Sequence, residues 1–197
     1  MPKLKPVPKS EKLVFPVMTA RCNAYKEQLR VEELVEDQIL IIHNLFTPSN
    51  CLAYKRFFEA TVAPKLAQPV APKRGEARRT NERFSQPDET FAEHLFQASG
   101  LAEIPEVQAL GSGRLAGLNP NIRIYRYKEG AIFGPHYDDS VREQVSGQIC
   151  VSAWTLLIYL SDNLVGGETS FRLGQGETIA PPVKDGMALL HRHGHDW

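Results

Sequence analysis

Hydrophobic and polar positions follow different patterns in the two halves of the chain. In the first half, a β-branched run at residues 38–42 predicts a strand. A helix is predicted next, with Thr47 as its capping residue and Pro48 at its first position, and Pro64 is expected to end it. One face of this helix carries the apolar or aromatic residues Cys51, Tyr54, Phe58 and Val62. That spacing is typical of an amphipathic helix.

Residues 64–87 are predicted to be mainly loop, because Pro and Gly recur within them. The densest basic cluster of the chain lies here and consists of Lys73, Arg74, Arg78, Arg79 and Arg83. Two interpretations stay open: a solvated surface loop, or a loop that holds an acidic substrate or partner. Asp88 is then expected to cap a second short helix that ends at Gly100.

Short strand-like runs dominate the chain from residue 120 onward, with Gly or Pro between them. These runs are Ile122–Tyr127, Phe133–Asp138, Trp154–Leu160, Glu168–Arg172 and Met187–His191. Helices first and many short strands afterwards predict an α+β chain whose second half is a sandwich or a jelly-roll barrel.

Length and composition fit one domain preceded by a short tail. The chain has 197 residues, of which 42% are hydrophobic, so a sizeable core is available and wholesale disorder is excluded. Residues 1–17 are rich in Lys and Pro and are predicted to be a flexible basic arm. Residues 18–197 are predicted to form the domain, with its core in residues 120–197.

Charge and cysteine content narrow the function classes. The 23 Lys and Arg residues balance the 23 Asp and Glu residues, so no overall charge favours nucleic acid or a membrane surface. No apolar run approaches the roughly 20 residues of a membrane span, and the N-terminus lacks the apolar segment of a secretory signal. Three widely spaced cysteines imply neither a disulfide framework nor a zinc site. Cytoplasm or nucleus is therefore the expected compartment.

The sharpest chemical feature is the pair formed by His136 and Asp138. On a strand, residues two apart point to the same side, whereas Tyr137 and Asp139 would face away. An imidazole and a carboxylate supply two ligands of the 2-His-1-carboxylate triad, which suits Fe(II) and would also accept Mn(II) or Ni(II). Taken alone, the pair favours an ordinary hydrogen-bonded histidine beside an acidic turn over a metal site.

The neighbouring residues resemble a known family. The segments Tyr127–Gly130 and Phe133–Asp139 resemble the first metal strand of the prolyl-hydroxylase-like Fe(II)/2-oxoglutarate-dependent dioxygenases. Three later segments follow in the family's order, at residues 154–162, 166–171 and 181–190. In its overall sequence pattern the chain most resembles fungal members of this family. The resemblance implies a double-stranded β-helix, a jelly-roll or cupin-like fold, with helices flanking it on the N-terminal side.

The resemblance also implies roles for individual residues. His136 and Asp138 match the first two iron ligands. Tyr127 matches a tyrosine near the metal-bound end of 2-oxoglutarate, and Tyr159 matches one that helps to hold the distal carboxylate of this co-substrate. Ascorbate is a further candidate cofactor. Either tyrosine also suits a core position, although alternation along the strand predicts that Tyr159 points into the barrel.

The sequence departs from the family pattern at its C-terminal end. The family's distal histidine and the basic residue that anchors 2-oxoglutarate lie beyond the strand at 187–190. We expect that histidine a few residues past Trp197, so the C-terminal strand is expected to be missing. Alternatively, one of the histidines at 191, 193 and 195 takes over the role, with His195 the best placed.

Three functions follow as hypotheses. The first is an oxygenase that hydroxylates a protein side chain, with proline a candidate, while 2-oxoglutarate is decarboxylated to succinate. The second is an oxygenase acting on nucleic acid or a small molecule, for which a basic groove with stacking aromatics would be expected. The third is a catalytically inactive binding or regulatory module on the same scaffold. The sequence predicts neither the substrate nor the oligomeric state.

Overall fold

The computed structural model describes residues 12–20, 28–110, 113–162 and 164–194. Within them the chain is a mixed α+β structure with several antiparallel sheets, which confirms the predicted fold class at that level. His195 and the first eleven residues of the predicted arm lie outside the described residues. No helix in the described ranges is long and apolar enough to cross a membrane.

The first half alternates strands and helices. In chain order its elements are β1 (Arg30–Val35), β2 (Ile39–His43), α2 (Pro48–Phe57), a π-helical turn (Phe58–Val62), a 3-10 turn (Ala63–Lys65), β3 (Glu82–Pro87), α3 (Glu89–Ala98), a 3-10 turn (Leu101–Glu103) and α4 (Pro105–Gln108). The second half is built of short strands. They are β4 (Asn121–Arg126), β5 (Arg142–Val145), β6 (Gln148–Val151), β7 (Trp154–Ile158), β8 (Phe171–Arg172), β9 (Thr178–Ile179), with a 3-10 turn (Gly174–Gly176) before β9, and β10 (Ala188–Arg192).

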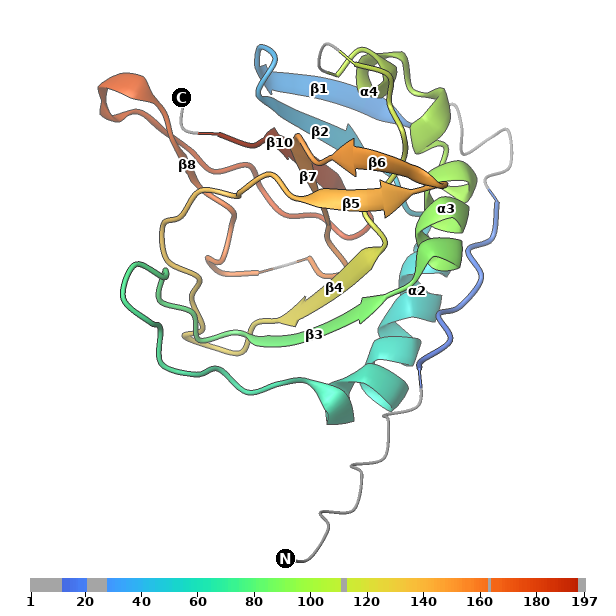
Figure 1. Cartoon of the computed structure of the whole chain (residues 1–197). Coiled ribbons are helices and arrows are strands. Elements are labelled where there is room, and N and C mark those ends of the chain that lie inside the picture. The colour runs from blue at the N-terminus through green and yellow to red at the C-terminus, as the bar shows by residue number, and fades with distance from the viewer. Residues whose placement is uncertain (1–11, 21–27, 111–112, 163, 195–197) are drawn as a thin grey trace, which may run out of the picture.

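A four-stranded antiparallel sheet in the order β1-β2-β10-β7 unites the two halves (Figure 1). Strand β10 lies between β2 and β7, and its register places Leu189 opposite both Ile41 and Leu157. The same register places His191 opposite Thr155. Two further two-stranded sheets, β3–β4 and β5–β6, and the short hairpin β8–β9 complete the strands.

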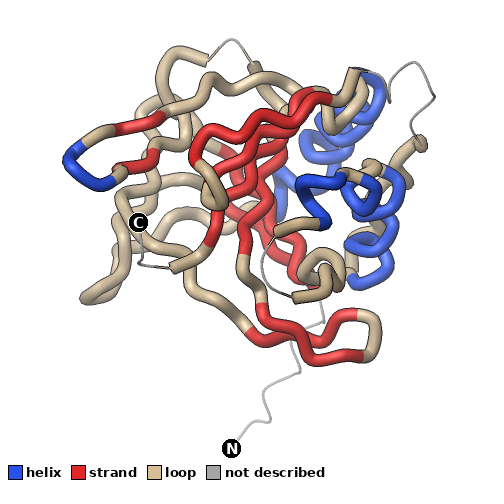
Figure 2. Tube along the Cα trace, turned by 90° about the horizontal axis from the view of Figure 1, so that it is seen from above, coloured by secondary structure: helices blue, strands red, loops and turns tan. Residues whose placement is uncertain are grey.

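The two faces of this sheet are both apolar but pack against different partners. One face belongs to the main core, which also includes residues of α2 and α3, and carries Leu40, Ile42, Ala188 and Leu190. The opposite face carries Ile39, Ile41, Met187 and Leu189 and packs against residues of β7 and β8. Figure 2 shows the helices on one side of the strands and the loops and short hairpin on the other. Each fully buried Leu or Ile contributes about 1.5–3 kcal/mol, so this two-sided sheet holds the fold together.

The predicted helix starts are confirmed by their caps. Thr47 caps α2, since its hydroxyl oxygen accepts a hydrogen bond from the backbone N–H of Asn50 at 3.2 Å. Asp88 caps α3 in the same way through Phe91, at 3.1 Å. The predicted end at Pro64 is displaced, because α2 ends at Phe57 and the chain continues as a π-helical and then a 3-10 turn.

Part of the predicted loop at residues 64–87 is wrong, because Glu82–Pro87 forms β3 and pairs with β4. Most residues of this strand are polar, and two of them, Glu82 and Gln86, are buried, as is Asn81 just before the strand. A hydrophobic pattern does not reveal a strand whose covered positions are polar. The burial is tolerated because Glu82 and Gln86 have hydrogen-bond partners.

The arm predicted for residues 1–17 is also wrong where the structure describes it. From Lys12 onward the segment lies against the domain, with Leu13 and Phe15 buried. The Leu13 N–H donates to Gln86 Oε1 at 2.7 Å, and the Phe15 ring stacks on Phe91 with centroids 4.4 Å apart. Alternate apolar side chains therefore fix this stretch despite its prolines. The division into arm and domain otherwise stays a prediction.

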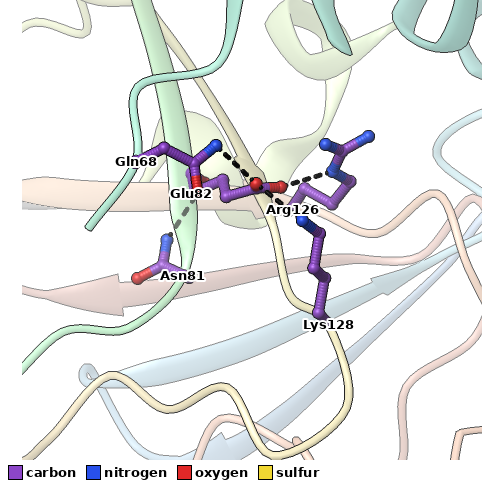
Figure 3. Close-up of polar contacts among 5 residues, drawn as sticks. All are labelled: Gln68, Asn81, Glu82, Arg126 and Lys128. Carbon is purple, nitrogen blue, oxygen red and sulfur yellow. Dashed lines mark hydrogen bonds and ion pairs between the residues drawn. The ribbon is translucent and has the colours of Figure 1, made fainter.

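A buried carboxylate ties β3, β4 and the preceding loop together (Figure 3). Glu82 is 3% exposed and accepts hydrogen bonds from Lys128 Nζ at 2.8 Å, Arg126 Nε at 2.7 Å and Gln68 Nε2 at 2.8 Å. These bonds to Lys128, Arg126 and Gln68 lower the pKa of Glu82 to about 2. Because Arg126 and Lys128 both turn toward Glu82, the intervening Tyr127 projects to the other side of the strand.

We expect Glu82→Gln to lower the melting temperature at pH 7, because it removes the charge that Arg126 and Lys128 compensate. The pKa of Glu82 is depressed on folding, so its contribution is complete above the ordinary value of 4.5 and is lost as the pH falls toward about 2. Melting curves from pH 7 to pH 3 should therefore show the gap between wild type and variant closing. Glu129→Gln is the exposed control with the same charge change. A gap that is constant over this range would contradict the assignment.

Candidate metal centre

The segment that carries the two predicted metal ligands is not a regular strand, contrary to the prediction for residues 133–138. It is extended and held by isolated contacts to an earlier loop. The Gly134 N–H donates to the Arg78 carbonyl at 2.7 Å, and the Ile132 N–H donates to the Thr80 hydroxyl at 2.8 Å. A Cβ on Gly134 would lie 3.3 Å from the same carbonyl oxygen, so this close approach favours glycine. The segment continues to His136 without a strand partner.

The His136 ring is oriented by its own backbone. Its Nδ1 lies 2.9 Å from the Gly134 carbonyl oxygen. Because a carbonyl oxygen only accepts, Nδ1 carries a hydrogen, and in the neutral ring Nε2 therefore presents a lone pair. That Nε2 faces Asp138 Oδ1 at 3.5 Å. A histidine whose second nitrogen donates to a carbonyl is the usual arrangement of a metal-ligating imidazole.

The Asp138 carboxylate contacts three other residues of the candidate site, His136, Thr155 and His191. Its Oδ2 accepts a hydrogen bond from the Thr155 hydroxyl at 2.7 Å and lies 3.5 Å from His191 Nε2. Its contact with His136, followed by the Thr155 bond and the charge of His191, lowers the pKa of Asp138 well below its usual range. The same contact with Asp138 is the main cause that raises the pKa of His136. Each of the two groups therefore favours the charged form of the other.

Two further histidines lie near Asp138. His191 is in β10, and His193 is the residue that follows this strand. By strand alternation His191 shares its face with Leu189, whereas Arg192 lies on the other face and is exposed. His193 Nε2 lies 2.8 Å from the Thr155 hydroxyl, whose hydrogen is used on Asp138. His193 Nε2 is then the donor, and its Nδ1 is buried without a partner among the described residues. Burial lowers the pKa of both histidines, so both favour the neutral form.

The described residues thus bring His136, Asp138 and His191 together but do not complete a triad. No group of three His, Cys, Asp or Glu side chains within them is arranged to hold a metal ion. The two histidines face different oxygens of Asp138. The neighbours Tyr137 and Asp139 are exposed.

The two predicted co-substrate residues differ in their surroundings. Tyr159 packs with Leu157 and Phe171 on the face of the four-stranded sheet that carries Leu189. Its hydroxyl lies 2.7 Å from the Thr169 hydroxyl. Tyr127 is 50% exposed.

The residues present fit the first two positions of a metal centre. Adjacent donors on one metal ion lie about 3 Å apart at bond lengths of about 2.1 Å. The Nε2 of His136 and the Oδ1 of Asp138 are 3.5 Å apart and both present lone pairs when the histidine is neutral. A cation held between these two atoms would accept both lone pairs. This donor set fits Fe(II) and neighbouring divalent metals.

Sequence reasoning missed the approach of His191 to Asp138. The signal that could have found it was alternation, because His191 follows Leu189 and Met187 by two and four residues on a strand whose apolar partners are clear. The register that sets His191 opposite Thr155 needs the structure, since β7 and β10 are joined by a long connection without a tight turn. His195, the residue favoured from sequence, lies outside the described ranges.

Comparison with known proteins gives one informative match. No family model matches the sequence. Prolyl 4-hydroxylase 1 of Arabidopsis thaliana is 26% identical over 165 residues, which covers 80% of this chain and 55% of that protein. The chain therefore spans about half the length of the curated relative that it matches. This similarity agrees with the resemblance of the motifs around His136, and the chain is similar to the prolyl-hydroxylase-like 2-oxoglutarate dioxygenases.

Proposed function

We propose that this chain is an Fe(II)- and 2-oxoglutarate-dependent oxygenase built on a double-stranded β-helix, with His136 and Asp138 as metal ligands. One observation carries the proposal. The Gly134 carbonyl fixes the His136 tautomer so that Nε2 and the Asp138 carboxylate turn two lone-pair donors toward each other. The similarity to a prolyl 4-hydroxylase supports the choice of metal and co-substrate.

For the third ligand we propose His191 among the described residues. Its Nε2 lies 3.5 Å from Asp138 Oδ2, and burial favours its neutral, metal-binding form. The alternative, that His195 or a later histidine completes the triad, stays a prediction. Single substitution of each by alanine distinguishes them, because loss of the true third ligand weakens metal binding far more than loss of the other.

The protein's own residues orient the reactants. Iron(II), when bound with 2-oxoglutarate and oxygen, supplies the oxidation, in which 2-oxoglutarate loses carbon dioxide to give succinate and the substrate gains a hydroxyl group. Thr155 holds the Asp138 carboxylate through its hydroxyl, at 2.7 Å. Tyr159 offers a phenol to the distal carboxylate of 2-oxoglutarate, and Tyr127 offers one near the metal. Ascorbate would keep the metal reduced.

A protein side chain, with proline the first candidate, is the proposed substrate. The support is the similarity to the Arabidopsis prolyl 4-hydroxylase, of which this chain covers 55%. The balanced charge of the chain gives no support to a nucleic-acid substrate. The cytoplasm or nucleus remains the proposed compartment.

Substitution of His136 or Asp138 by alanine should abolish succinate formation, because each removes one of few protein ligands. Asp139→Ala is the matched control, since Asp139 is an exposed carboxylate one position along the chain. Succinate is measured by proton NMR after incubation with Fe(II), 2-oxoglutarate and ascorbate. Turnover that survives both ligand variants would refute the site. Folded wild type without turnover would favour the inactive binding module.

Tyr159→Phe should raise the 2-oxoglutarate concentration for half-saturation about tenfold, the equivalent of ~1.4 kcal/mol for one hydrogen bond to a charged group. The maximal rate should change little, because the phenol acts on the end of the co-substrate remote from the metal. Tyr137→Phe is the control, since that ring is 57% exposed. Equal half-saturation in the two variants would remove Tyr159 from the co-substrate site.

A further inference from the structure

Three flat groups form a continuous column behind the proposed metal ligand. The His136 ring stacks on the Phe133 ring, with centroids 3.8 Å apart and planes 17° from parallel. The guanidinium carbon of Arg79 lies 3.8 Å from the centroid of the Phe133 ring. Arg79 also lies over the Tyr125 ring, at 5.9 Å. A cation from the basic cluster of residues 73–83 is thus connected to the metal ligand through one aromatic ring.

The backbone fixes Arg79 in this column. Arg79 and Phe133 form an isolated antiparallel bridge. On one side of the bridge the Gly134 N–H donates to Arg78 at 2.7 Å, and on the other the Thr80 N–H donates to Ile132 at 2.8 Å. Arg79 is half-buried, whereas Arg78 is exposed. Neighbouring arginines therefore have different environments, which makes one the control for the other.

Among the described residues, no carboxylate forms an ion pair with Arg79. Arg126 and Lys128, by contrast, each form an ion pair with the carboxylate of Glu82. The face of Phe133 is therefore the main partner of the Arg79 guanidinium. Planar guanidinium groups stack well on aromatic rings, and the attraction grows when water is excluded.

We propose that Arg79 is a positioning residue that aims the imidazole of His136 through Phe133. The inference rests on the proposed function of His136 as a metal ligand. The Gly134 carbonyl holds one edge of the ring, but rotation about that contact would still move Nε2 away from Asp138. Stacking on Phe133 restricts the plane of the ring, and Arg79 holds Phe133 from its other face. Together the two contacts fix the direction of Nε2.

The first test needs no metal. The ring current of Phe133 shifts the carbon-bound protons of His136 upfield, and their NMR signals are assigned by their loss in His136→Ala. In Arg79→Gln these signals should move toward the positions of an unstacked histidine. In Arg78→Gln, which removes the same charge from the neighbouring exposed position, they should stay in place. Circular dichroism confirms that each variant is folded.

The second test measures Mn(II) binding by electron paramagnetic resonance. Arg79→Gln should raise the dissociation constant about tenfold, the lower end of what loss of a supporting contact costs a metal site. Arg79→Lys, which keeps the charge, should recover part of the loss, and Arg78→Gln should match wild type. Phe133→Leu should weaken binding as much as Arg79→Gln, and the double variant should be no weaker, because both act through one column.

The outcomes separate this inference from the proposed function. Mn(II) binding that is absent in wild type, or that survives His136→Ala, would refute the metal site, and the NMR shifts would still decide whether Arg79 orients the ring. If the His136 signals and the dissociation constant respond alike to Arg79→Gln and Arg78→Gln, Arg79 does not position the ligand and the metal site stands without it.

Discussion

The carboxylate of Asp138 is the constraint on which the rest of the site depends. It meets the His136 ring at one oxygen and the Thr155 hydroxyl and His191 at the other. Three segments that are distant in sequence, those that carry His136 and Asp138, Thr155 and His191, must be correctly placed for these contacts to form. A buried or half-buried carboxylate needs such partners, because desolvation of an unpaired charge is costly. A divalent cation meets the same need, which is why the arrangement fits a metal centre.

Two sets of contacts elsewhere in the fold, the pairing of β2, β10 and β7 and the ionic contacts of Glu82, position the surrounding segments. The order β2-β10-β7 buries an apolar row on each face of the sheet, and a shift of one residue would turn His191 away from Thr155. The buried Glu82 binds Arg126, the last residue of β4, and Lys128 two residues later, and so ties this end of β4 to β3. The placement of the candidate site residues therefore depends on the strand pairing of the whole domain.

Local rules were sufficient to predict the helix caps at Thr47 and Asp88 and the apolar strands of the main sheet. They failed at β3, where Glu82 is buried by its ionic partners rather than by hydrophobicity. They also failed at residues 133–138, where the chain is extended without a regular ladder. The His136–Asp138 pair could be predicted from motif resemblance. The approach of His191 depends on the register between distant strands, and no local pattern contains it.

The most direct test of the central claim is an anaerobic titration of the protein with Fe(II) and 2-oxoglutarate, followed in the visible range. The account predicts a charge-transfer band from 2-oxoglutarate bound to the metal through two oxygens, and the loss of this band in His136→Ala. Folded protein that shows no band, or a band of equal intensity in His136→Ala, would contradict the claim that His136 and Asp138 form the metal centre.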